Sequence, residues 1–259
     1  PGNPVELQVI ATIYPTVEVP EDWKNLNATV ALETVPEILD AAVEEALLSI
    51  RRARAKAAIQ AASTDTPPPA ADAAIADELL PELNDEFAQS LGQFTDLADL
   101  KVKLRENMRA EKAQQVKDKR RGTLVEALVE KTQVDVPNIF VESELDKIVA
   151  QLKEDVVRFG LTYDDYLKRM QKTEEEVRTE FRDQARKRAK LQLTLNKIAE
   201  VEKVEADKEK VDEEMKHAME HFPDARPELV RIHIETVLRN EKVLQLLEGK
   251  PEAEKAVAE

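Results

Sequence analysis

The sequence contains no cysteine, only five glycines, and only 4% aromatic residues. Without cysteine the chain can carry out no thiol catalysis and form no disulfide, which suits a cytoplasmic protein. Few glycines and aromatics argue against an all-β fold, and the sequence has no Walker loop and no dinucleotide fingerprint. Since no apolar run reaches 18 residues, we predict no membrane-spanning segment and no membrane partner.

Positive charge is also in deficit, because the formal net charge is −15. Phosphate backbones are bound by clustered cations, so we expect no nucleic acid partner. The abundant residues are Ala, Leu, Glu, Lys and Arg, which favour helices. We therefore predict a mainly α fold with a small N-terminal strand-containing segment.

The helix around which the others are expected to pack begins after Thr173 and runs to about Glu202. Thr173 and Glu176 have the spacing of a capping box, which satisfies free backbone donors at a helix start. One-sided apolar residues follow at helical spacing: Val177, Phe181, Ala185 and Ala189. From Leu191 to Val201 the apolar residues occupy several sides, so this half should be covered by other helices.

The N-terminal part has a different pattern. Alternation over Val5–Ile13 predicts a strand with one buried face, and Thr29–Val35 is a candidate second short strand. Pro36 suits the first residue of a helix that runs to about Ala62. The proline-rich stretch 63–77 is then an extended linker.

A long helical pattern extends from Thr95 to about Lys131, with a nearly all-polar middle. One continuous helix of this length would protrude with a solvated middle. The alternative is two helices broken at Gly122. Prolines, caps and glycines delimit four further helices: Pro137 to Gly160, one from Thr162, Asp207 to Pro223, and Pro227 to Gly249.

Little in the sequence suggests catalysis. His217, Glu220 and His221 match the H-x-x-E-H pattern of some zinc peptidases, but no distal ligand region accompanies them. We interpret them as part of a solvated helix face. The sequence therefore predicts a protein that is not an enzyme and has no catalytic residue, no metal and no cofactor.

What remains is an excess of apolar helix surface, which suits a protein that holds apolar segments of other proteins. Adaptable methionine side chains favour varied contacts. The candidate binding residues on one helix are Val141, Leu145, Ile148, Leu152, Val156 and Phe159. The candidates on the last two helices are Met215, Met219, Phe222, Leu229 and Ile232.

An ordered series of segments resembles trigger factor, the bacterial ribosome-associated chaperone. These are Tyr14–Val19, Glu78–Phe87, Val134–Pro137, Thr173–Glu176 and Leu191–Glu202. The resemblance implies an elongated, multi-helix domain with two protruding arms that enclose an apolar crevice for nascent or unfolded polypeptides and act without ATP.

The family's ribosome-binding domain, with its G-F-R-x-x-x-x-P loop, and its prolyl isomerase domain have no counterpart in this sequence. Ribosome contact would therefore require a domain absent from this chain, and isomerase activity is not carried over. We expect one discontinuous chaperone domain, made of segment 1–62, linker 63–77, helical region 78–249 and tail 250–259.

The functional hypothesis is thus a cytoplasmic, ATP-independent holdase that binds apolar segments of other chains. One alternative is a helical module that assembles with further copies of itself, and a weak homodimer is compatible with both. A second alternative is a SurA-like periplasmic chaperone, which has a similar helical architecture.

Overall fold

The computed structural model describes residues 13–62 and 80–249, without the side chains of 60–62. Most of the predicted first strand, the linker 63–77 and the tail 250–259 lie outside the described residues.

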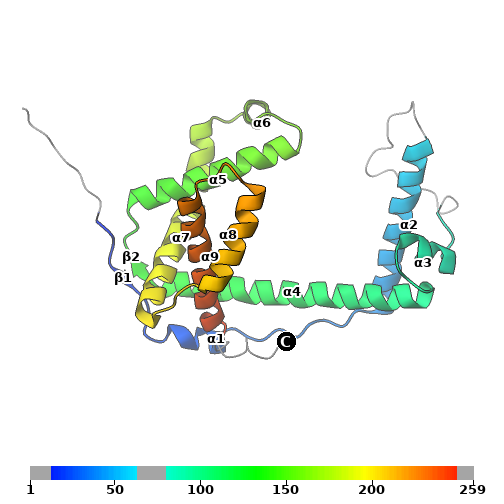
Figure 1. Ribbon diagram of the computed structural model, residues 1–259, viewed down its shortest axis with the longest axis horizontal. Helices are drawn as coiled ribbons and strands as arrows, with labels where there is room; N and C mark the ends of the chain where they lie inside the picture. Colours follow the sequence, from blue (N-terminus) through cyan, green and yellow to red (C-terminus); the bar gives the residue numbers. More distant parts are fainter. Residues whose placement is uncertain (1–12, 63–79, 250–259) are drawn as a thin grey trace, which may run out of the picture. The chain divides into compact units, whose positions relative to one another are not determined.

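The described residues are mainly helical, as predicted (Figure 1). None of their helices combines the length and apolarity needed to traverse a bilayer. The strands are β1 (Val17–Glu18) and β2 (Gln133–Val134). The helices are the 3-10 helix η1 (Trp23–Asn25), α1 (Leu26–Thr29), α2 (Asp40–Ala62), α3 (Asp85–Leu91), α4 (Leu97–Lys131), α5 (Asn138–Arg158), α6 (Tyr163–Met170), α7 (Glu174–Glu202), α8 (Lys208–His221) and α9 (Pro227–Leu247).

The described residues form two compact units. Unit 1 comprises residues 13–31 and 121–249, and unit 2 comprises residues 32–62 and 80–120. The boundary falls within α4, which contributes its first part to unit 2 and its last part to unit 1.

The main core of unit 1 surrounds the second half of α7. Leu195, Ile198 and Ala199 pack there with Leu124 and Leu128 of α4. The same cluster also contains four residues from η1, α1 and α9: Trp23, Leu26, Val243 and Leu247. The prediction that this half of α7 is covered from several sides is therefore confirmed.

Local sequence explains where α7 begins and ends. The Thr173 side chain accepts from the Glu176 backbone N–H at 3.2 Å, and the Glu176 carboxylate accepts from the Thr173 backbone N–H at 2.8 Å. This is the predicted capping box. The helix ends at Glu202, and the φ of its C-cap residue Lys203, 56°, lies in the left-handed region.

A two-stranded sheet joins the N-terminal segment to the start of α5. Val17 of β1 pairs with Val134 of β2, and Glu18 pairs with Gln133, in antiparallel register. Just after β1, Trp23 enters the core with 6% of its surface exposed.

The long helix α4 continues through Gly122, so the alternative of two helices broken there is wrong. Glycine within a helix costs about 1 kcal/mol relative to alanine. The contacts on both sides of Gly122 offset this cost. Arg121 pairs with Glu241 at 2.8 Å and with Glu248, and Leu124 is fully buried.

Unit 2 has its own apolar cluster, in which Val43 and Leu47 of α2 pack against Ala88 of α3 and Leu100 of α4. The predicted strand Thr29–Val35 is wrong, since α1 ends at Thr29 and residues 30–39, between α1 and α2, form no strand. Residues 31–37 are all exposed, and none of the described strands pairs with them, so their strand propensity is not sufficient to form a strand. The helix predicted from Pro36 begins only at Asp40.

Candidate functional site

The face of α5 that the sequence suggested for binding is largely buried inside unit 1. Val141, Leu145 and Ile148 pack with Ala185 and the partly buried Phe181 of α7. Val156, further along α5, is also buried, and Leu152 is half-buried. The α5–α7 pair, meaning α5 with the first half of α7, thus covers this stripe with the chain's own residues.

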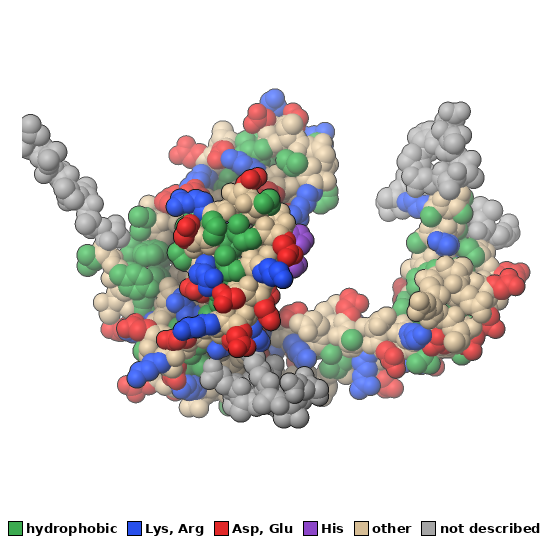
Figure 2. Space-filling model, viewed as in Figure 1, with side chains coloured by type: hydrophobic (Ala, Val, Ile, Leu, Met, Phe, Trp, Pro, Cys, Tyr) green, Lys and Arg blue, Asp and Glu red, His purple; other side chains and the backbone are tan. Residues whose placement is uncertain are grey.

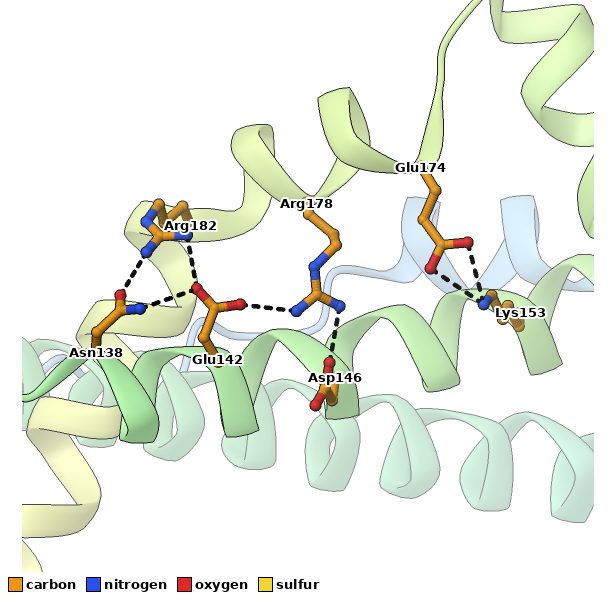
Figure 3. Close-up of polar contacts among 7 residues, drawn as sticks. All are labelled: Asn138, Glu142, Asp146, Lys153, Glu174, Arg178 and Arg182. Atoms are coloured by element: carbon orange, nitrogen blue, oxygen red, sulfur yellow. Dashed lines mark hydrogen bonds and ion pairs between the residues drawn. The ribbon is translucent and has the colours of Figure 1, made fainter. Parts of the chain in front are cut away.

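Polar contacts run along the edge of the α5–α7 pair (Figure 3). Arg178 of α7 donates to Glu142 at 2.8 Å and to Asp146 at 2.7 Å. Arg182 pairs with Glu142 at 2.9 Å and also donates to Asn138. These contacts join the partly exposed edges of α5 and α7 beside the apolar stripe.

The charged partners shift one another's pKa values. The hydrogen bond from Arg178, with that from Arg182, lowers the pKa of Glu142 below its ordinary value of 4.5. Hydrogen bonds to Asp146 and Glu142 raise the pKa of Arg178. Because a carboxyl with a lowered folded-state pKa stabilises the fold only when ionised, its contribution is full above pH 4.5 and is lost as the pH falls below it.

This linkage gives a pH-dependent prediction for Glu142→Gln, which cannot form the ion pairs. The stability difference between the natural protein and the variant should be constant from neutral pH down to about pH 5 and shrink below about pH 4.5. Urea unfolding across this range measures it. A difference that grows on acidification would contradict the assigned role of Glu142.

Most of the α5 residues that the sequence suggested for client binding are therefore buried. Val141, Leu145 and Ile148 serve as core because α7 packs on them, and Val156 is also buried further along α5. Phe159 differs, since it follows the helix as its C-cap residue and is 84% exposed.

The candidate residues on the α8–α9 hairpin lie nearer the surface. Phe222, Leu229 and Ile232 are exposed, with 67%, 55% and 59% of their surface accessible. Met215 and Met219 are half-buried. Val211 is buried near the start of α8, and Arg231 of α9 pairs with Asp212 of α8 at 2.9 Å. The hairpin is thus anchored while its apolar residues stay open.

Sequence reasoning did not single out Val237 as a binding candidate, although it is 49% exposed on α9. We name Phe222, Leu229, Ile232 and Val237 the α8–α9 apolar surface. Figure 2 shows hydrophobic side chains gathered on the face of unit 1 that carries α8 and α9. Helical periodicity identifies Val237 as an apolar residue of this helix, but it does not show that the side chain is exposed to solvent.

Two grooves adjoin this surface. One, of about 400 Å³, is lined by Ile232 together with Val204, Val211 and Arg239. The other, of about 370 Å³, is lined by Val237 and Leu244 of α9 and by Leu191 and Leu195 of α7. The apolar surface therefore continues into concave, partly polar walls on α9.

The H-x-x-E-H segment lies on α8, where His217 and His221 are exposed. In the described part of the chain, no group of three or more His, Cys, Asp or Glu side chains is arranged to hold a metal ion. The three-ligand centre that a zinc peptidase requires is thus not formed there.

Comparison with known proteins agrees with the resemblance. A family model described as the C-terminus of bacterial trigger factor protein matches residues 96–258. The trigger factor of Caldicellulosiruptor bescii is 34% identical over 136 residues, which are 52% of this chain and 31% of that protein. The trigger factor of Exiguobacterium sibiricum is 31% identical over 179 residues, or 69% of this chain and 40% of that protein.

The chain spans about a third of the length of curated trigger factors such as the one from Caldicellulosiruptor bescii. A solved structure of a trigger factor chaperone aligns with 66% of this chain and with 43% of its own chain, at 21% sequence identity. Its TM-score is 0.36, so this structural similarity is too low to support the family assignment. The family model alone covers more than half of the sequence. This chain therefore belongs to the trigger factor family, to whose C-terminal region its residues correspond.

Proposed function

We propose that this chain is a non-catalytic, ATP-independent chaperone module that holds apolar segments of nascent or unfolded polypeptides. The family assignment supports a chaperone role, and it favours trigger factor over the SurA-like alternative. The observation that carries the proposal is the α8–α9 apolar surface, where large apolar side chains stay exposed on a hairpin anchored by the buried Val211 and by the Arg231–Asp212 pair. Exposed apolar patches of this kind mark binding surfaces.

The proposed mechanism is burial of client side chains against this surface. Removing apolar area from water contributes roughly 25 cal/mol per Å². The groove beside Val237 offers Leu191 and Leu244 next to Arg188, Asn240 and Glu241, so a bound segment would find both apolar contact and hydrogen-bonding groups. The half-buried Met215 and Met219 can adapt their shape to different side chains.

The test is suppression of aggregation of a chemically denatured client protein. Replacing Phe222, Leu229 and Ile232 together by Ser should weaken client binding by roughly a hundredfold, if each side chain contributes about 1 kcal/mol. Because all three are exposed, the circular dichroism spectrum and the unfolding transition should stay nearly unchanged.

A matched control replaces three exposed apolar residues of unit 2 by Ser: Leu32, Leu39 and Val102. The proposed site is supported if this control suppresses aggregation fully while the α8–α9 variant does not. Equal loss in both variants would mean that any exposed apolar residue suffices. No suppression by the natural chain at several-fold excess would refute the holdase proposal.

A second copy of the chain could also cover the α8–α9 apolar surface. Concentration-dependent mass measurements distinguish this assembly function from client binding. A stable dimer that fails to bind denatured protein, and that the triple Ser variant converts to monomer, would favour assembly. Weak self-association that a client disperses would fit the holdase.

A further inference from the structure

His217 and His221 lie one helical turn apart near the end of α8. Their ring centroids are 4.5 Å apart, with the ring planes inclined by 36°. Residues four apart project from the same side of a helix, so both rings can approach one ion. Both residues are exposed, and Figure 2 shows histidine side chains at the surface beside α8.

A hydrogen bond selects the tautomer that the second ring adopts when it is neutral. Nδ1 of His221 lies 3.0 Å from the backbone carbonyl oxygen of His217. Since a carbonyl oxygen only accepts, Nδ1 carries the donated hydrogen. The neutral ring then has its lone pair at Nε2. Metal-ligating histidines are usually held in this way, with the other ring nitrogen donating to a carbonyl or a carboxylate.

The charge around the pair favours a cation. Helix α8 carries five carboxylates and three lysines. No described group of three or more ligand side chains is arranged for a metal, so water would fill the remaining coordination positions. Imidazole nitrogens suit zinc, nickel and copper, whereas calcium and magnesium prefer oxygen ligands.

We propose that His217 and His221 form a two-imidazole site for a divalent transition-metal ion. The site revises the sequence-based expectation that these residues bind no metal. It is an open surface site with two protein ligands, unlike the closed four-ligand sites that stabilise small domains. It is independent of the client-binding proposal.

Metal binding at this pair has a structural consequence. His221 is the last residue of α8, and Phe222 of the α8–α9 apolar surface is its C-cap. An ion bound to both rings links the last two turns of the helix. Because the ion binds the helical arrangement better than the unfolded one, it stabilises this end of α8.

The experiment is isothermal titration of the tag-free, 259-residue chain with zinc chloride at pH 7.5. We expect one zinc equivalent to bind. His217→Ala and His221→Ala should each weaken zinc affinity about tenfold or more, because each removes one of two ligands. His233→Ala removes an exposed histidine of α9 and should leave the affinity unchanged. Calcium chloride should give no comparable heat.

Hydrogen exchange supplies a second measurement on the same protein. Zinc should slow amide exchange in the last turns of α8, and the His217→Ala variant should lose this effect while keeping its helical circular dichroism. The proposal is overturned if the natural chain takes up no zinc below about 1 mM. Unchanged zinc binding in a His217→Ala, His221→Ala double variant, or equal weakening in His233→Ala, also overturns it.

Discussion

Leu145→Asp is expected to unfold the α5–α7 pair. Leu145 has no exposed surface and lies in the cluster with Val141, Ile148 and Ala185. Losing the leucine side chain alone costs about 2–5 kcal/mol, and a carboxylate left in its place adds the penalty of an unpaired buried charge. The sum rivals the whole stability of a typical domain, about 5–15 kcal/mol.

Hydrogen exchange measured by mass spectrometry checks this locally. Amides of α5 and of the first half of α7 should lose protection, while those in the Trp23 cluster keep it. Ile139→Asp is the matched control, because it adds the same charge to the same helix at a residue that is 60% exposed. The control sits in the first turn, where a negative charge suits the helix dipole. Equal protection in both variants would contradict the packing assigned to Leu145.

This result bears on how client binding is tested. A polar substitution at Val141, Leu145, Ile148 or Val156 would abolish binding by unfolding the α5–α7 pair, whether or not the residue contacts a client. Substitutions at the exposed Phe159, or in the α8–α9 apolar surface, change the surface without removing core contacts. Only the exposed residues therefore separate a binding role from a structural one.

Helix limits were the most predictable part of the fold, because they depend on local chemistry. The Asp207 side chain accepts from the backbone N–H of Glu209 and starts α8. Thr173 starts α7, and Pro227 is the first residue of α9. Each signal lies within three residues of the boundary that it sets, so no knowledge of tertiary contacts was needed.

Whether each apolar helix face is buried or exposed could not be predicted from local sequence. The stripe of α5 and the apolar residues of the α8–α9 hairpin have similar helical spacing, yet α7 covers the first and leaves the second open. Which face meets a partner helix is a long-range property that spacing does not carry. The sequence therefore identified Phe222, Leu229 and Ile232 among the binding candidates but could not separate them from Leu145.

The same limit explains the errors in the N-terminal segment. Thr29–Val35 has strand-like composition, but nothing in the described structure pairs with it. Val17 and Glu18 do form a strand, because β2 lies beside them despite a separation of over a hundred residues. A segment forms a strand only when another strand pairs with it, and a single sequence does not show which segment that partner is.

Leu124→Ala is expected to lower the free energy of unfolding of unit 1 by about 2–5 kcal/mol. Leu124 is fully buried and lies between α7 and α9 in the cluster that contains Trp23. Truncating its side chain leaves a cavity where the last part of α4 meets the second half of α7. Neighbouring helices recover only part of the lost contacts, because they are themselves packed on other sides.

Trp23 provides the measurement, since it is the chain's only tryptophan and is buried in this cluster. Its fluorescence should report the unfolding of unit 1 in urea, with a lower midpoint for Leu124→Ala and an unchanged slope. Val201→Ala is the control, because Val201 is an exposed residue of α7 and its truncation should change stability by less than about 0.5 kcal/mol. If Leu124→Ala unfolds at the same urea concentration as the natural chain and Val201→Ala, the end of α4 does not belong to this core.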